Sequence, residues 1–330
     1  MARNLITDVA GVRVGHAGDD RLGSGSTVVV FDAPVVGSVD VRGGGPGTRE
    51  TALLDPAQTV SGIDAVALSG GSAFGLDAAS GVQALMREMG RGFKVRTATV
   101  PIVPSAILFD LLSGGDKNWG RFPPYREFGY EAAKNAALDF ALGSVGAGIG
   151  ATTATLKGGV GSASVKTKHG ITVGALAVVN GIGTVTVGDG PHFWAAPFEQ
   201  NGEFGGRGPA PKVTADDLSF RAKGGPLMNT TIAVIATDAK LTKAECNRLA
   251  VMAQDGFARA IYPVHTPLDG DVVFAAATGQ VALPDPIWGL AELGMHASNV
   301  MARAIARGVY EAKSLSFPGA LSSWKDKFGR

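Results

Sequence analysis

Hydrophobic and polar positions follow two different periods along this chain, one typical of strands and one typical of helices. Short runs of β-branched and small apolar residues indicate buried strands. Apolar residues spaced three and four apart indicate helices. The predicted strands cover residues 6–16, 26–32, 39–42, 64–69, 147–155, 159–166, 171–179, 182–188, 232–238 and 271–278, and the predicted helices cover 73–89, 130–141, 242–261 and 287–312.

The order of these elements predicts one domain with a four-layer α/β sandwich. Strands are dense in the middle of the chain and helices form separate blocks, which favours sheets packed together with helices outside. No internal repeat or clean boundary divides the 330 residues. Asn180-Gly181, between the runs 171–179 and 182–188, predicts a two-residue hairpin. The glycine-rich polar segment 201–226 is predicted to be an exposed loop, and the polar end 314–330 is predicted to be peripheral.

Composition and charge exclude several classes of protein. A hydrophobic content of 45% with 18% charged residues is typical of a globular domain. A net charge of +1 gives no electrostatic reason to expect nucleic acid or an anionic membrane as a partner. The single cysteine, Cys246, fits a reducing compartment, and the N-terminus lacks the pattern of a signal peptide. We therefore expect a cytoplasmic protein.

Motifs for cofactors and metals are missing from the sequence. The glycine-rich stretches at residues 43–48 and 70–72 match neither G-x-x-x-x-G-K-[ST] nor a complete G-x-G-x-x-G. The five histidines (16, 169, 192, 265 and 296) are far apart, and none forms a ligand pair at helical spacing. A G-x-S-x-G nucleophile elbow is also absent. We expect no cofactor and no metal.

One short polar segment, Asn229-Thr230-Thr231, lies directly before the apolar run at 232–238. Cleavage of the Asn229–Thr230 bond would make Thr230 N-terminal, with its hydroxyl as nucleophile and its own α-amine as base. A free α-amine has a pKa of roughly 8, so modest tuning makes it a competent base. The same three residues are also typical of an ordinary turn whose hydroxyls bond the backbone.

Four other residues complete a candidate site around Thr230. Asp269 and Asp271 are two apart at the start of a predicted strand, so their side chains share a face and could hold a protonated α-amine. Asn180 could donate its amide to an oxyanion. Lys157 could stabilise negative charge or tune the nucleophile. Taken singly, Asp-Gly-Asp and Asn-Gly are typical of turns, and a lone lysine is typical of a surface.

Several longer motifs together resemble the self-processing aminopeptidase family. That family includes the L-aminopeptidase/D-esterase enzymes, the β-peptidyl aminopeptidases and nylon-oligomer hydrolase. The resemblance covers nearly the whole chain. The motifs are NTTI at 229–232, HTPLDGDVVFA at 265–275, GVRVGH at 11–16, PGTRET at 46–51, LSGGSAFGL at 68–76 and KGGVG at 157–161.

The resemblance implies a precursor that is cut before Thr230. The products would be an α chain, 1–229, and a β chain, 230–330, which stay together in an αββα sandwich like that of N-terminal nucleophile hydrolases. It also implies a homo-oligomer, commonly a tetramer, that hydrolyses small amides or peptides. Lys157, Asn180, Asp269 and Asp271 look like the supporting residues of the nylon-oligomer hydrolase branch.

This sequence departs from the aminopeptidase branch of the family. That branch uses a serine nucleophile, a tyrosine in the glycine-rich strand, and a serine and a glutamate in place of the two aspartates. None of the tyrosines (125, 130, 262 and 310) lies in that strand. The departure concerns aminopeptidase specificity and leaves the hydrolytic mechanism intact.

Two other functions remain open at this point. An acyl transferase similar to ornithine acetyltransferases would share the self-cleavage and pass the acyl group to an amine instead of water. A non-catalytic oligomeric binding protein would keep Asn229–Thr230 as an ordinary turn and stay a single chain. The sequence alone leaves the substrate, its stereochemistry and the linkage open.

Overall fold

The computed structural model of the chain describes residues 2–222 and 229–329. Residues 223–228, which include the end of the predicted loop and Leu227-Met228, lie outside them. The strands are β1 (Val12–Asp19), β2 (Ser24–Val41), β3 (Thr48–Arg49), β4 (Ile63–Ser69), β5 (Phe93–Val95), β6 (Ala98–Val100), β7 (Ser105–Ile107), β8 (Val160–Lys166), β9 (Thr172–Val178), β10 (Ile232–Ala239) and β11 (Val272–Val281). The helices are α1 (Ala78–Glu88), α2 (Tyr125–Lys134), α3 (Lys243–Ala253), α4 (Asp255–Ala258), α5 (Trp288–Tyr310) and α6 (Trp324–Phe328).

The long strand β2 belongs to two sheets. Its first part pairs antiparallel with β1 and β4, and its last residues, from Val36 to Val41, pair antiparallel with β11. The strand order is β3-β7-β4-β2-β11-β10-β9-β8, with β1 beside β2 and the hairpin β5–β6 separate. The pair β4–β7 is parallel, and β10 and β11 also run parallel. Their first residues therefore lie at the same edge of the sheet.

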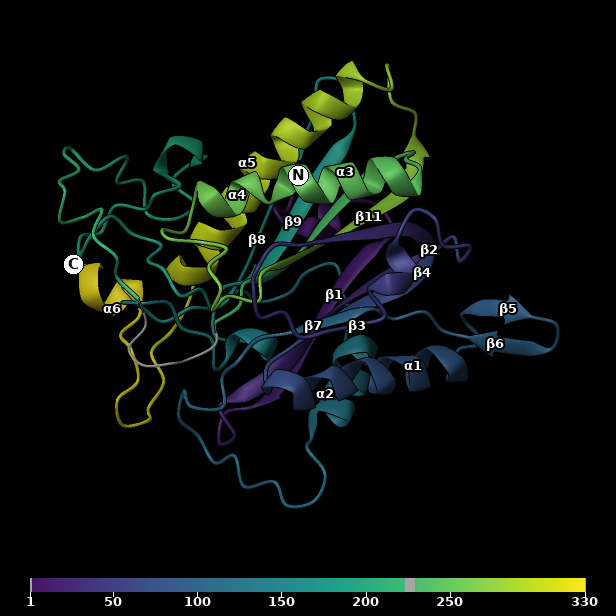
Figure 1. Cartoon of the computed structure of the whole chain (residues 1–330), viewed down its shortest axis with the longest axis horizontal. Coiled ribbons are helices and arrows are strands. Elements are labelled where there is room, and N and C mark those ends of the chain that lie inside the picture. The colour runs from purple at the N-terminus through teal and green to yellow at the C-terminus, as the bar shows by residue number, and fades with distance from the viewer. Residues whose placement is uncertain (1, 223–228, 330) are drawn as a thin grey trace.

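Alternating side chains on the strands divide the core into three layers of contacts. Val29 and Phe31 of β2 pack between the sheets with Ile232 and Val234 of β10. Val28 of β2 faces the other way, toward α1 and α2. The outer face of β8–β11 packs against α3, α4 and α5. Figure 1 shows α3, α4 and α5 on one side of the strands and α1 and α2 on the other, which confirms the four-layer αββα sandwich.

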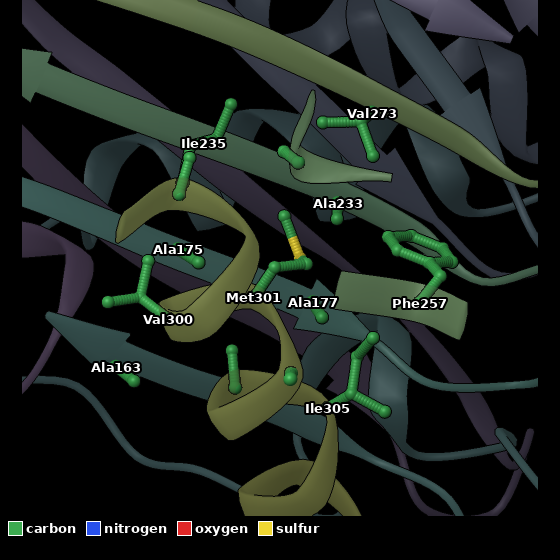
Figure 2. Close-up of a cluster of buried hydrophobic side chains, with 14 of the residues drawn as sticks. Ala163, Ala175, Ala177, Ala233, Ile235, Phe257, Val273, Val300, Met301 and Ile305 are labelled. Carbon is green, nitrogen blue, oxygen red and sulfur yellow. The ribbon is translucent and has the colours of Figure 1, made fainter. Parts of the chain in front are cut away.

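Helix α5 lies very close to the strands β8 and β9. Figure 2 shows Met301 and Ile305 of this helix in the same cluster as Ala175 and Ala177 of β9. A Cβ added to Gly161 of β8 would lie 1.9 Å from the carbonyl oxygen of Ala304, so only glycine permits this approach. The small residues of these strands thus have a packing role. Across the described residues, no helix combines the length and apolar character that a membrane span requires.

Several predicted elements differ from the structure. A 3-10 helix, Ile6–Asp8, precedes β1 where one strand was expected, and α2 ends at Lys134. Residues 147–155 form no strand, because this glycine-rich stretch begins with the 3-10 helix Gly146–Gly148. The hairpin across Asn180-Gly181 is wrong: β9 pairs with β8 and β10 on its two sides, so no edge is left for residues 182–188. The segment 201–222 is largely exposed, although Phe204 is buried.

Candidate active site

The polar segment before β10 lies beside the Asp-Gly-Asp segment before β11. The parallel register that pairs Ile232 with Val272 extends backward to a bridge between Asn229 and Asp269. Asn229 N donates to Leu268 O at 2.9 Å, and Gly270 N donates to Asn229 O at 2.7 Å. Two segments 40 residues apart in sequence are therefore fixed against each other at one sheet edge.

The Asn229–Thr230 peptide bond is buried and is surrounded by donors and acceptors. Thr230 is only 2% exposed. Its Oγ1 donates to Asn229 O at 2.5 Å, so the hydroxyl lies against the carbonyl that it would attack. Thr230 N donates to Asn180 O at 3.0 Å on the opposite side of the strand. We call Asn229, Thr230, Asp269, Gly270 and Asp271 the Thr230 centre.

Gly270 is a site residue that the sequence reasoning missed. Its amide is the main-chain donor to the Asn229 carbonyl, and a Cβ at this position would lie 2.7 Å from Thr230 Oγ1 and 2.6 Å from Gly45 O. A side chain here would displace the hydroxyl, because real Cβ contacts are longer than 3 Å. The signal in the sequence is the glycine between the two aspartates, a pattern that is also typical of a turn.

Asp269 is held mainly by the segment that precedes it. Its Oδ2 accepts from Thr266 N at 3.0 Å and from Thr266 Oγ1 at 2.8 Å, and its Oδ1 accepts from Ile182 N at 3.2 Å. Burial, together with the nearby charge of Asp271, raises the pKa of the Asp269 carboxyl above its ordinary value. The side chain is 1% exposed, so these hydrogen bonds fix its orientation.

The side chain of Asp271 takes part in the hydrogen bonding between the segments before β10 and β11. Its Oδ1 accepts from Thr231 N at 2.7 Å, and its Oδ2 lies 2.9 Å from His265 Nδ1. The carboxylate thus contacts the amide directly after Thr230. The structure places both predicted aspartates beside the Asn229–Thr230 bond, with different partners.

Asn180 lies beside the Asn229–Thr230 bond through its main chain. Its carbonyl accepts from Thr230 N, while its side chain accepts from Thr152 N at 3.0 Å and donates to Phe109 O at 3.2 Å. These contacts of the Asn180 amide hold neighbouring loops. A main-chain donor to the Asn229 carbonyl comes from Gly270 N.

Lys157 is buried, with 1% of its surface exposed. Its Nζ donates to the carbonyl oxygens of Gly148 at 2.8 Å, Ala151 at 2.6 Å and Gly158 at 2.7 Å. These contacts hold the loop from which Thr152 N reaches Asn180. Lys157 thus supports the wall of the site, which differs from the surface position that a lone lysine usually takes.

A run of glycines covers the Asp-Gly-Asp segment. Gly43 N and Gly45 N donate to Asp271 O and Asp269 O at 3.3 and 2.7 Å. A Cβ at Gly43 would lie 2.3 Å from Asp271 N, so the two backbones touch. In the described residues, 2–222 and 229–329, no group of three His, Cys, Asp or Glu side chains is placed to hold a metal ion.

Solved structures with the same fold define the class of protein. A β-aminopeptidase from Burkholderia sp. matches with a TM-score of 0.73 and 22% identity, covering 99% of this chain and 92% of that one. The L-aminopeptidase D-Ala-esterase/amidase from Ochrobactrum anthropi, described as a variant of the Ntn-hydrolase fold, matches with a TM-score of 0.72 and 20% identity, covering 99% and 94%. The chain has the fold of an N-terminal nucleophile hydrolase.

The family follows from the sequence comparisons. Residues 4–320 match the model of peptidase family S58, and the chain belongs to this family of peptide-bond hydrolases. An uncharacterized aminopeptidase from Mycobacterium tuberculosis is 45% identical, covering 97% of this chain and 100% of the relative. A 6-aminohexanoate-oligomer endohydrolase from Kocuria sp. is 28% identical, covering 85% and 76%. The resemblance inferred from the sequence motifs is confirmed.

Proposed function

We propose that the chain cuts its own Asn229–Thr230 bond and then hydrolyses small amides or peptides with Thr230 as an N-terminal nucleophile. The observation that carries this proposal is the geometry of one carbonyl. Asn229 O accepts from Gly270 N at 2.7 Å and lies 2.5 Å from Thr230 Oγ1. A backbone donor is thus aimed at the oxygen that becomes negative when the hydroxyl attacks.

Self-cleavage proceeds by transfer of the Asn229 acyl group from nitrogen to oxygen. Thr230 Oγ1 attacks the Asn229 carbonyl carbon, and the carbonyl oxygen gains charge that Gly270 N stabilises. The C–N bond breaks, and the hydroxyl proton ends on the Thr230 nitrogen. Water then hydrolyses the ester and releases the Asn229 carboxylate. One oxyanion donor of this kind contributes roughly 10²- to 10³-fold in rate.

The mature enzyme would use the same hydroxyl on substrate. The new α-amine of Thr230 removes the hydroxyl proton, and the hydroxyl forms an ester with the substrate acyl group before water releases it. Thr230 N already lies 3.0 Å from Asn180 O, an acceptor for one hydrogen of that amine. Asp269 and Asp271 supply negative charge at the same edge, which favours an amine that can hold a proton.

The substrate class follows from the two kinds of named relative. An aminopeptidase and a 6-aminohexanoate-oligomer endohydrolase both act on amide bonds. We infer small amides or peptides as substrates, hydrolysed by α chain 1–229 and β chain 230–330 acting together. A cytoplasmic homo-oligomer, with a tetramer favoured, completes the proposal. Light scattering after gel filtration tests its size.

The decisive experiment is the intact mass of the purified chain with N-terminal sequencing of the smaller fragment. The wild type should give a fragment that begins Thr-Thr-Ile-Ala-Val. Thr230→Ala should stay full length without amidase activity. Thr231→Ala is the matched control, because the hydroxyl of Thr231 has no hydrogen-bond partner among the described residues. A cleaved, active Thr230→Ala enzyme would overturn the proposal.

Product analysis separates hydrolysis from acyl transfer. With an amide substrate and a competing amine at high concentration, a hydrolase should release mainly free acid. A dominant new amide would instead assign the acyl-transferase activity. A chain that stays uncleaved after long incubation and lacks both activities would favour the binding-protein alternative.

A further inference from the structure

His265 lies next to the Thr230 centre in a conformation that few residues adopt. Its φ is +55°, in the left-handed region. Its main-chain N donates to Asp271 Oδ2 at 3.2 Å, and its ring Nδ1 lies 2.9 Å from the same oxygen. The ring is stacked on buried Phe257, with centroids 5.6 Å apart and planes at 29°. Two hydrogen bonds and one stacking contact thus aim this side chain at a single carboxylate oxygen.

The other oxygen of Asp271 occupies a position that a main-chain acceptor would ordinarily fill. The ladder between β10 and β11 continues backward from Ile232 and Val272 to the bridge at Asn229. Between Asn229 and Ile232, Thr231 N donates to Asp271 Oδ1 at 2.7 Å. A carboxylate that holds a backbone amide can rotate unless its second oxygen is fixed. His265 supplies that second contact.

We propose that His265 is a positioning residue, which donates from Nδ1 to Asp271 Oδ2 and thereby keeps Oδ1 on the amide of Thr231. The amide of Thr231 follows the nucleophile directly, so its fixation sets where Thr230 Oγ1 lies relative to the Asn229 carbonyl. An ionised carboxylate only accepts hydrogen bonds, so the imidazole carries its proton on Nδ1. This role rests on the proposed function.

The role of His265 complements that of the next residue, Thr266. Thr266 binds Asp269 through its amide and its hydroxyl, while His265 binds Asp271 through its amide and its ring. Consecutive residues therefore fix the two aspartates of the centre. His265 is 20% exposed in its side chain and Asp271 only 1%, so the pair lies at the boundary between solvent and the buried bond.

Two substitutions of equal size separate a donor from a packing role. Asn and Asp both accept a left-handed backbone, and both lose the stacking contact with Phe257. The amide of His265→Asn can donate to Asp271 Oδ2, whereas His265→Asp brings a third carboxylate beside it. We measure self-cleavage of the freshly translated full-length chain by intact mass, a readout that needs no substrate.

We expect His265→Asn to cleave within about tenfold of the wild-type rate and His265→Asp to be about 100-fold slower, as for loss of a charge-assisted hydrogen bond. If His265→Asp does not fold, His265→Gly replaces it, because glycine suits the backbone and has no donor. Equal rates for the donor and non-donor variants would overturn the role of His265. An uncleaved wild type, or a cleaved Thr230→Ala chain, would instead overturn the proposed function.

Discussion

Two buried clusters of aspartate and hydroxyl groups in this molecule are chemically alike and differ in what they touch. One is the Thr230 centre. The other, which we call the Asp110 cluster, consists of Asp110, Ser24, Tyr125 and Gly71. Asp110 Oδ2 accepts from Ser24 Oγ at 2.6 Å, Oδ1 accepts from Gly71 N at 2.8 Å, and Tyr125 OH donates to Ser24 Oγ at 3.1 Å.

Burial and pKa do not distinguish the two clusters. Burial raises the pKa of Asp110, as it raises the pKa of Asp269. The difference is the acceptor that each hydroxyl faces: Ser24 faces a carboxylate, whereas Thr230 faces the carbonyl of its own peptide bond. A hydroxyl can take over an acyl group when it faces the carbonyl of a peptide bond, whereas a carboxylate offers it no such group. The comparison therefore supports the chemistry proposed for the Thr230 centre and indicates a structural role for the Asp110 cluster.

The largest expected effect comes from adding one methyl group to the Thr230 centre. In Gly270→Ala the new Cβ would lie 2.7 Å from Thr230 Oγ1, so the hydroxyl must move and self-cleavage should fall at least about 100-fold. Gly181→Ala is the matched control, because its Cβ would meet Thr231 and Ile261 only at 3.4 Å or beyond. Intact mass over time measures both. A Gly270→Ala chain that cleaves as fast as Gly181→Ala contradicts the geometry.

A substitution at Lys157 tests whether this residue, which the sequence predicted for the active site, acts by holding the surrounding loop in place. Lys157→Met would leave three buried carbonyls without their ammonium donor, and we expect a loss of at least about 3 kcal/mol of unfolding free energy, since each unsatisfied buried acceptor costs about 1–3 kcal/mol. Cleavage should slow as well, because the loop that holds Asn180 is loosened. Urea denaturation measures the stability. A variant with unchanged stability and no cleavage would instead assign Lys157 a direct role in the cleavage reaction.

The sequence predicted the strands around Thr230 better than it predicted the contacts of the site. The continuous apolar runs at 232–238 and 271–278 predicted two strands, because such a run needs a core on both faces of its sheet. The contacts of Asn180 could not be predicted in this way, because its partners, Thr152 and Phe109, come from loops without periodicity. The Asn-Gly hairpin prediction failed for a different reason: β9 is paired on both sides, by β8 and β10.

Glycines were the weakest point of the sequence reasoning. Some glycines allow close packing, as Gly161 does beneath α5. The same residue type also lies against the Asp-Gly-Asp segment, at Gly43 and Gly45, and beside Thr230, at Gly270. A glycine has no side chain from which its role could be inferred. Only the segment that it contacts in the fold distinguishes a glycine that allows helix packing from one beside Thr230.

A pH experiment compares the carboxyls of the two clusters. The pKa of Asp110 and of Asp269 is raised by burial, so the folded chain binds these protons more tightly than the unfolded chain. Their contribution to the unfolding free energy is therefore greatest below pH of about 4 and falls as pH rises through the raised pKa values. Asp110→Asn and Asp269→Asn should each reduce this fall, as measured by urea denaturation at several pH values.

Cleavage separates these two variants. Asp110→Asn should cleave normally, since an amide can still accept from Gly71 N and donate to Ser24 Oγ. Asp269→Asn should cleave more slowly, because its oxygens accept three donors and an amide nitrogen cannot accept. Equal cleavage rates in the two variants would erase the distinction between the clusters. A pH slope that matches wild type in both would contradict the raised pKa values.

The smallest expected effect lies in the hydroxyl of the Asp110 cluster. Ser24→Ala removes the donor to Asp110 Oδ2 and the acceptor of Tyr125 OH, both buried, and should cost about 1–3 kcal/mol of unfolding free energy. Ser26→Ala, on the same strand, removes only a hydroxyl pair with Ser69 at 2.8 Å and should cost about 0.5–1.5 kcal/mol. Neither contacts the Asn229–Thr230 bond, so self-cleavage should match wild type in both. The side chain of Asn180 donates to Phe109 O, next to Asp110 in the chain. A Ser24→Ala chain that folds but stays uncleaved would show that the Asp110 cluster acts on the Asn229–Thr230 bond through this contact.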